Sequence, residues 1–155
     1  MGFRSVEAAV EKIMGTERTL CIIKPDAVEK RKMGAILARL EEEGFEVVAL
    51  RRTHLTKKEA EGFYAVHRER PFFGELVQFM TRSPVVIAVL QRDGAVVKYR
   101  DVMGATDPAK AAPNTLRKLF GSNVGENATH GSDSLENAKI EIAYFFPGCE
   151  VASVG

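Results

Sequence analysis

Apolar residues recur along the chain with two different spacings, which predict alternating strands and helices. Short apolar runs predict buried strands at 19–23, 45–50 and 85–90, and the last run (VVIAVL) is apolar enough to be central in a sheet. Apolar residues three and four positions apart predict helices over these stretches: 34–43, 56 to about 67, 71 to about 80, 95 to about 103, and a final helix after Asp133.

Local signals mark the ends of these elements. Thr56 with Glu59 three residues later forms a capping box, and Asp133 with Glu136 is expected to cap the final helix. Pro71 is expected to open the helix that it precedes. Residues 104–126 are rich in Gly, Pro, Asn and Ala and predict a long loop, followed by a last short strand over 127–131. The order of elements predicts an α/β sandwich of one sheet covered by helices.

The first 16 residues carry a separate helical pattern, with apolar side chains at Val6, Ala9, Val10 and Ile13. We expect residues 1–16 to form an amphipathic extension that docks on the body or on a neighbouring subunit, while 17–155 form a single domain. A targeting or membrane role and an unstructured end are the alternatives for this extension.

Charge and cysteine content narrow the function classes. Lys and Arg number 22 against 21 Asp and Glu, so the net charge is +1, which argues against strong nucleic-acid binding but leaves room for a small anionic ligand held by local cations. The two cysteines are too few for a disulfide scaffold and favour a reducing compartment. No apolar run approaches the roughly 20 residues of a membrane-spanning helix, and no P-loop or G-x-G-x-x-G motif is present.

Candidate chemistry centres on His130, which falls between the last short strand and the final helix. A neutral imidazole is a good nucleophile toward phosphorus because it needs no deprotonation at neutral pH. Glu141 could accept a hydrogen bond from the second ring nitrogen. Lys24 directly follows the first buried strand, and Arg100 and Arg117 flank the long loop, so these cations could hold a di- or triphosphate. Taken alone, each of these residues more often has an ordinary structural or surface role.

Together these residues resemble the nucleoside diphosphate kinase family from about Glu17 to Phe146. Five stretches carry the resemblance, in matching order and spacing: ERTLCIIKPDAV at 17–28, FYAVHRERPFF at 63–73, SPVV at 83–86, RDVMGATDPAKAAPNTLR at 100–117 and NATHGSDS at 127–134. The resemblance implies a ferredoxin-like, four-stranded antiparallel sheet covered by helices, with a long nucleotide-binding loop. It also implies a ping-pong enzyme that moves the γ-phosphate of a nucleoside triphosphate, mainly ATP, to a nucleoside diphosphate through a phosphohistidine.

The resemblance also assigns roles to individual residues. His130 would be the nucleophile, with Glu141 orienting its ring and Ser132 hydrogen-bonding nearby. Lys24 would contact the sugar 3′-hydroxyl and the phosphates, with Tyr64 close to the histidine. The remaining nucleotide contacts would be the base-stacking Phe72 with Val124, the phosphate-binding Arg100, Thr106 and Arg117, and the sugar-binding Asn127.

Further expectations concern cofactor, assembly and location. Mg²⁺ would be carried by the nucleotide phosphates with no direct protein ligands. The resemblance implies a cytoplasmic homo-oligomer, a hexamer in preference to a tetramer. A nucleotide-binding regulatory member with little turnover is the alternative function. Family members usually have Pro-Gly-Thr before the second arginine, where this chain has Asn114. Because Asn tolerates the left-handed conformation, we expect the turn to survive.

Overall fold

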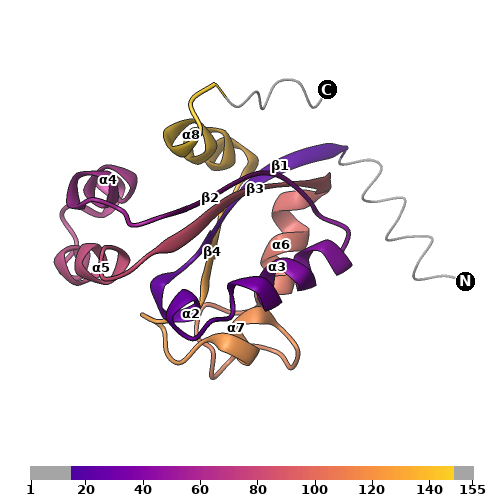
Figure 1. Ribbon diagram of the computed structural model, residues 1–155, viewed down its shortest axis with the longest axis horizontal. Helices are drawn as coiled ribbons and strands as arrows, with labels where there is room; N and C mark the ends of the chain where they lie inside the picture. Colours follow the sequence, from indigo (N-terminus) through magenta and orange to yellow (C-terminus); the bar gives the residue numbers. More distant parts are fainter. Residues whose placement is uncertain (1–14, 149–155) are drawn as a thin grey trace, which may run out of the picture.

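A computed structural model describes residues 15–148 and shows one four-stranded antiparallel sheet (Figure 1). The strand order is β2-β3-β1-β4, with β1 (Thr16–Ile23) and β3 (Val85–Asp93) in the middle. The edges are β2 (Glu46–Thr53) and the three-residue β4 (Thr129–Gly131). This topology confirms the predicted ferredoxin-like sheet and the central position of 85–90.

Helices cover both faces of the sheet (Figure 1). One face carries α2 (Pro25–Glu29), α3 (Met33–Glu42), α6 (Ala95–Met103) and α7 (Leu116–Phe120). The other carries α4 (Lys57–Phe63), α5 (Phe73–Met80) and α8 (Leu135–Phe145). A 3₁₀ turn, η1 (Ala65–His67), joins α4 to α5.

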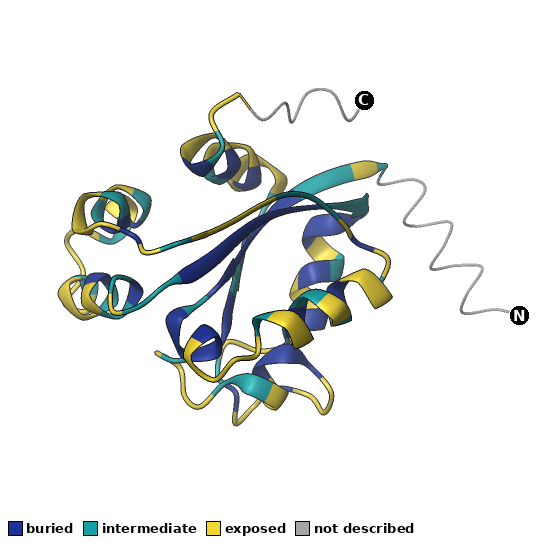
Figure 2. Cartoon of the chain, in the orientation of Figure 1, coloured by how far each residue is buried: buried dark blue, intermediate teal, exposed yellow. Residues whose placement is uncertain are grey.

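The strands in the middle of the sheet are buried on both faces, as Figure 2 shows. Along β3, Val86, Ala88 and Leu90 pack with one layer of helices, and the alternate residues Val85, Ile87 and Val89 pack with the other. Successive strand side chains point to opposite faces, so a continuous apolar run fills two cores at once. Full burial of each of these larger side chains is worth about 1.5–3 kcal/mol.

Three predicted helix boundaries differ from the structure. The capping box of Thr56 and Glu59 is present, but α4 ends at Phe63 because Tyr64 leaves the helical conformation while its ring is buried in the core. The helix expected from Pro71 begins at Phe73, since the preceding residues form a turn.

The cap of the final helix was also wrongly predicted. Ser134, not Asp133, is the N-cap of α8, and its hydroxyl accepts a hydrogen bond from the Asn137 N–H. Asp133 instead accepts from the side-chain amide of Asn137, at 2.6 Å, because it lies one residue before the cap.

The segment 104–126 is less irregular than the sequence predicted. It contains α7, which Thr115 caps by accepting from the Lys118 N–H, and which buries Leu116 completely. The short helix α2 was not predicted, although Pro25 at its first position is a typical helix-start signal. The expected last strand shortens to 129–131.

The amphipathic extension predicted for 1–16 lies almost wholly outside the described residues; Thr16 is already the first residue of β1. Within residues 15–148, no helix has the length and apolar character required to cross a membrane.

Asn114 adopts the left-handed conformation that its sequence position predicts. Its φ is +67°, and its carbonyl accepts a hydrogen bond from Arg39 Nη1 at 2.7 Å. The turn therefore persists without the glycine that the family usually has there.

We expect Asn114→Ala to lower the free energy of unfolding by about 1 kcal/mol, because a Cβ-bearing residue without a short polar side chain is strained at positive φ. Asn114→Gly is the matched control and should be as stable as the parent or slightly more stable. Urea unfolding at equilibrium measures both values, and equal stabilities for the Ala and Gly variants would contradict the strain argument.

Candidate active site

His130 lies on β4, where it pairs with Ile22 of β1. Its Nε2 is 2.9 Å from Glu141 Oε1 on α8. Ser132 Oγ donates to the same carboxylate oxygen at 2.9 Å and in turn accepts from the Leu20 N–H. Because an ionised carboxylate only accepts hydrogen bonds, the Nε2 atom carries the ring proton and Nδ1 keeps its lone pair.

Aromatic rings enclose the imidazole on one side. The ring of Phe63 meets that of His130 edge to face, with 5.4 Å between the centroids, and also contacts Tyr64. The Tyr64 hydroxyl is buried and has no hydrogen-bond partner in the described part of the chain. Burial, and next the charge of Glu141, raise the pKa of Tyr64, so this hydroxyl stays protonated and able to donate.

A tight turn before β4 fixes the backbone that carries His130. Ala128 is buried with φ +74°, and the Thr129 N–H donates to the Asn127 carbonyl across it, which makes a γ-turn. The Ala128 N–H donates to Asp26 Oδ2, and its carbonyl accepts from the Lys24 N–H. These two bonds join the turn to the end of β1 and hold a conformation that is strained for alanine.

Lys24 lies at the end of β1 in the same region, as the sequence predicted. Its Nζ donates to Asn127 Oδ1 at 2.8 Å, and Asn127 Nδ2 donates to the Thr106 carbonyl at 3.0 Å. Burial lowers the pKa of Lys24 to about 8, with repulsion from Arg117 adding to the effect and Asp26 opposing it. A cation held in this way has lost part of its hydration before any anion arrives.

Arg117 is buried, whereas Arg100 is exposed. The two terminal nitrogens of Arg117 donate to the carbonyls of Gly104 and Thr129, each at 3.0 Å, while its Nε has no partner among the described residues. Burial is the main cause that lowers the pKa of Arg117, and repulsion by Arg100 also contributes. The two arginines therefore contribute to one local field, with Arg117 also bracing the backbone before His130.

A cavity of about 600 Å³ adjoins this group of residues. Lys24, Phe72 and Val124 line it, and the side chains of Phe72 and Val124 are 48% and 55% exposed. The structure thus brings the two predicted base-contact residues to one slot, with Lys24 at its edge.

The slot has further lining residues that the sequence reasoning missed: Glu75, Leu76, Phe79, Arg82, Gly125 and Glu126. Leu76 follows Phe72 by four residues, so helical spacing could have found it. No sequence signal indicates Arg82, which lies in the turn between α5 and β3.

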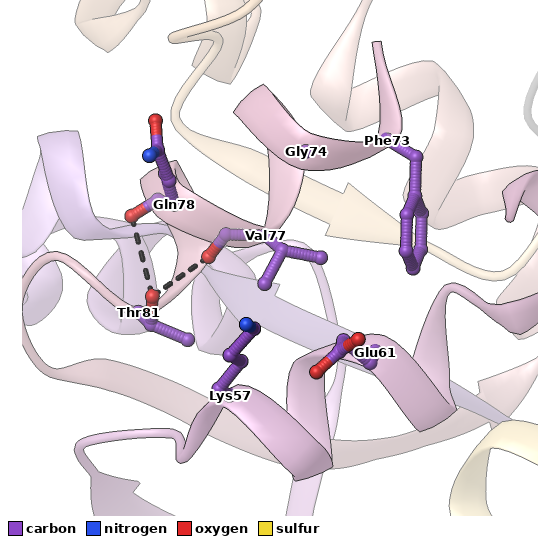
Figure 3. A pocket seen from close by; sticks show the side chains of 7 residues that line it. All are labelled: Lys57, Glu61, Phe73, Gly74, Val77, Gln78 and Thr81. Atoms are coloured by element: carbon purple, nitrogen blue, oxygen red, sulfur yellow. Dashed lines mark hydrogen bonds between the residues drawn. The ribbon is translucent and has the colours of Figure 1, made fainter. Parts of the chain in front are cut away.

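A second cavity, of about 480 Å³, lies between α4 and α5 (Figure 3). Lys57 and Glu61 reach it from α4, Phe73 and Val77 from α5, and Thr81 from the position directly after α5. None of the predicted site residues lines this cavity, whereas Lys24, Phe72 and Val124 line the slot; His130 lines neither of the two.

The sequence also gave no indication of a polar cluster that Tyr99 forms next to the backbone of His130. The Tyr99 hydroxyl contacts Thr129 Oγ1, Cys21 Sγ and the His130 carbonyl. Gly131 is required above it, because an added Cβ would lie 2.8 Å from the Tyr99 ring. These contacts join α6, β1 and β4, which are distant in sequence.

Comparisons with known proteins show the family of the chain. The family model described as "Nucleoside diphosphate kinase" matches residues 17–151. The chain belongs to the nucleoside diphosphate kinase family. A nucleoside diphosphate kinase of Sorangium cellulosum is 66% identical over 139 residues, covering 90% of this chain and 96% of that protein. One of Anaeromyxobacter sp. is 61% identical over 134 residues, covering 86% and 92%.

Solved structures of the same family share the fold. The nucleoside diphosphate kinase of Aquifex aeolicus superposes with a TM-score of 0.85 at 49% identity, covering 89% of this chain and all of that one. That of Encephalitozoon cuniculi gives a TM-score of 0.82 at 35% identity, covering 90% and 94%. The fold of this family member is therefore established along nearly the whole chain.

The lowered pKa of Lys24 predicts how kcat/KM depends on pH. Lys24 is charged below pH about 8 and loses its charge above it, so kcat/KM for a nucleoside diphosphate should fall above that pH, approaching tenfold per pH unit. Steady-state rates from pH 6 to 10 measure this alkaline limb. Lys24→Arg keeps the charge and should move the limb to higher pH, whereas an unmoved limb would assign the titration to another group.

Proposed function

We propose that the protein is a nucleoside diphosphate kinase that transfers the γ-phosphate of ATP to nucleoside diphosphates through a phosphorylated His130. The observation that carries the proposal is the His130–Glu141 pair. Glu141 engages Nε2 at 2.9 Å, which leaves Nδ1 as the nucleophilic atom. Lys24 and two arginines lie nearby, and a slot for a base opens beside Lys24.

In the first half-reaction, the Nδ1 lone pair of His130 forms a bond to the γ-phosphorus. The bond from that phosphorus to the β–γ bridging oxygen breaks, and a nucleoside diphosphate leaves with the electron pair. The ring keeps its Nε2 proton and gains positive charge, which the Glu141 carboxylate stabilises. A second nucleoside diphosphate then reverses these steps, so that no proton needs to be exchanged.

The surrounding residues would orient and stabilise the transferred group. Phosphoryl transfer depends mainly on positioning and on compensation of negative charge at the oxygens. Lys24, Arg100 and Arg117 would supply that charge, with Thr106 beside them. The unpartnered Tyr64 hydroxyl is available to donate close to His130, and Asn127 joins Lys24 to the predicted sugar site.

Nucleobase binding would rest on apolar contact. Phe72 would stack on one face of the base, with Val124 and Leu76 completing the slot. Stacking contacts the face of the base and not the hydrogen-bonding edge that differs between bases. We therefore expect all common ribo- and deoxyribonucleotides to serve as substrates.

Mg²⁺ would enter with the nucleotide. Among residues 15–148, no cluster of three or more His, Cys, Asp or Glu side chains could hold a metal ion. We propose that the phosphate oxygens of the nucleotide would hold the cation. When bound, Mg²⁺ supplies charge compensation between the β- and γ-phosphates.

A regulatory nucleotide-binding protein with little turnover is the second candidate. The intact chain of hydrogen bonds from Ser132 through Glu141 to His130 favours an active enzyme.

We further propose a cytoplasmic location, in line with the free, buried thiol of Cys21.

The protein would also assemble with copies of itself. β2 is an edge strand, and its Leu50 is 52% exposed. A second copy of the chain could therefore pair with this strand edge and cover this apolar residue. With the family resemblance, this supports a homo-oligomer, for which we favour six chains over four.

Incubation with γ-labelled ATP and Mg²⁺ should leave acid-labile, base-stable label on the protein, and added GDP should then yield labelled GTP. His130→Ala should retain nucleotide binding and take up no label. Label on the His130→Ala variant would assign the phosphate to another residue. A folded, ATP-binding parent without label would support the regulatory function.

Sedimentation velocity should give a mass of six times the 17.1 kDa chain. A mass of four chains would support the tetramer, and a single-chain mass at micromolar concentration would contradict the proposed assembly. Leu50→Asp is expected to weaken association, because it would place a charge on the exposed edge strand.

A further inference from the structure

Arg82 joins three segments at the rim of the slot. Its Nε and Nη2 donate to the two carboxylate oxygens of Glu29 at 3.0 and 2.7 Å, and Nη2 also donates to Glu126 Oε1 at 2.8 Å. Its guanidinium lies over the ring of Phe79, 5.0 Å from the centroid. Ser83 adds a hydrogen bond to Glu29 at 2.6 Å. One side chain therefore connects the end of α2, the turn after α5 and the segment 121–128.

The segment that Arg82 holds carries Val124. It is organised internally by Asn123, whose side-chain oxygen accepts from the N–H groups of Gly125 and Glu126, and by bonds from Ser122 and Asn123 to the Glu126 carbonyl. These bonds fold residues 122–126 into a compact loop, and Val124 is the middle residue of that loop.

Two cationic side chains fasten this unit to the body on the side of α2. Lys30 donates to the Ser122 hydroxyl at 2.8 Å and to the Phe120 carbonyl at 3.1 Å. Arg82 holds the other end through Glu126. The opposite wall of the slot differs, because Phe72 adjoins the helix α5 and Leu76 lies within it.

We propose that Arg82 is a positioning residue for nucleotide binding, which holds the Val124 wall at stacking distance from Phe72 through Glu126. Arg suits this role better than Lys because its fork can engage two carboxylates at once. The inference rests on the proposed use of the slot for the base. It predicts an effect on nucleotide affinity and none on phosphoryl transfer, because Arg82 acts through the slot wall and not on the transferred phosphate.

The test compares steady-state constants of the full chain with ATP as donor and with GDP and CDP as acceptors. Arg82→Met and Glu126→Gln should each raise KM by roughly threefold to tenfold, while kcat at saturation changes by less than about twofold. Because both variants remove the same ion pair between Arg82 and Glu126, the double variant should be no worse than the more affected single one. Arg82→Lys should fall between the parent and Arg82→Met.

Two further measurements test whether Arg82 acts by holding the loop through its ion pair or only by adding positive charge near the slot. Added salt weakens exposed ion pairs, so KM of the parent should rise with ionic strength more steeply than KM of Arg82→Met. Hydrogen exchange of the 121–126 amides should be faster in Arg82→Met and in Glu126→Gln than in the parent.

Arg51→Met is the matched control. Arg51 is an exposed arginine on β2 whose guanidinium also lies over a phenylalanine ring, that of Phe146, at 5.9 Å. It lines neither cavity, so its replacement should leave both KM and the exchange of 121–126 unchanged.

The outcomes distinguish this inference from the proposed function. A raised KM in Phe72→Ala, with unchanged KM in Arg82→Met, would overturn the role of Arg82 alone. A raised KM in Arg82→Met with an unchanged one in Glu126→Gln would mean that Arg82 does not act through its ion pair with Glu126, and would also overturn the inference. An unchanged KM in Phe72→Ala would overturn the slot assignment together with the inference that rests on it.

Discussion

The pairing of β4 with β1 is the constraint on which the site depends. β4 has only three residues, too few to form a stable strand alone, yet it carries His130. The strand is placed by its pairing with the central strand β1 and by the γ-turn at Ala128, both of whose backbone polar groups are bonded to the Lys24–Asp26 segment. The nucleophile and the main cation of the proposed site are thus set by one local backbone arrangement.

Buried polar side chains of α6 and α7 stabilise this placement of β4. Tyr99 contacts the His130 carbonyl from α6, and Arg117 donates to the Thr129 and Gly104 carbonyls from α7. A buried polar group is costly unless it is hydrogen-bonded, so these contacts favour one placement of β4 over its alternatives. The same desolvation lowers the pKa of Lys24 and Arg117, which prepares both cations for an anionic ligand.

The two walls of the proposed base slot are held in place by different interactions. The wall with Leu76 is part of a helix that packs on the sheet, so apolar burial holds it. The wall with Val124 is a compact loop fastened by the charged side chains Lys30 and Arg82. If the slot binds the base as proposed, a helical wall and a wall held by ion pairs would allow bases of different size to be contacted on both faces.

Sequence patterns located the strands, the helix faces, the capping box of Thr56 and the family with its motif residues, although β1 already begins at Thr16 and β2 extends to Thr53. These features depend on residues that are close in sequence, where hydrophobic period and side-chain chemistry act locally. Even the left-handed turn at Asn114 could be anticipated, because the conformation is a property of that residue type.

The sequence did not show where α4 ends or that α7 forms within the predicted loop, and it placed the cap of α8 at Asp133 instead of Ser134. For α4 and α7 the deciding factor is tertiary packing, which buries Tyr64 and Leu116. The same holds for the hydrogen bond of Glu141 to Nε2, the contacts of Tyr99 and the bridge made by Arg82. These interactions join elements that are far apart in the chain, and their geometry exists only once the sheet and both helical layers have packed.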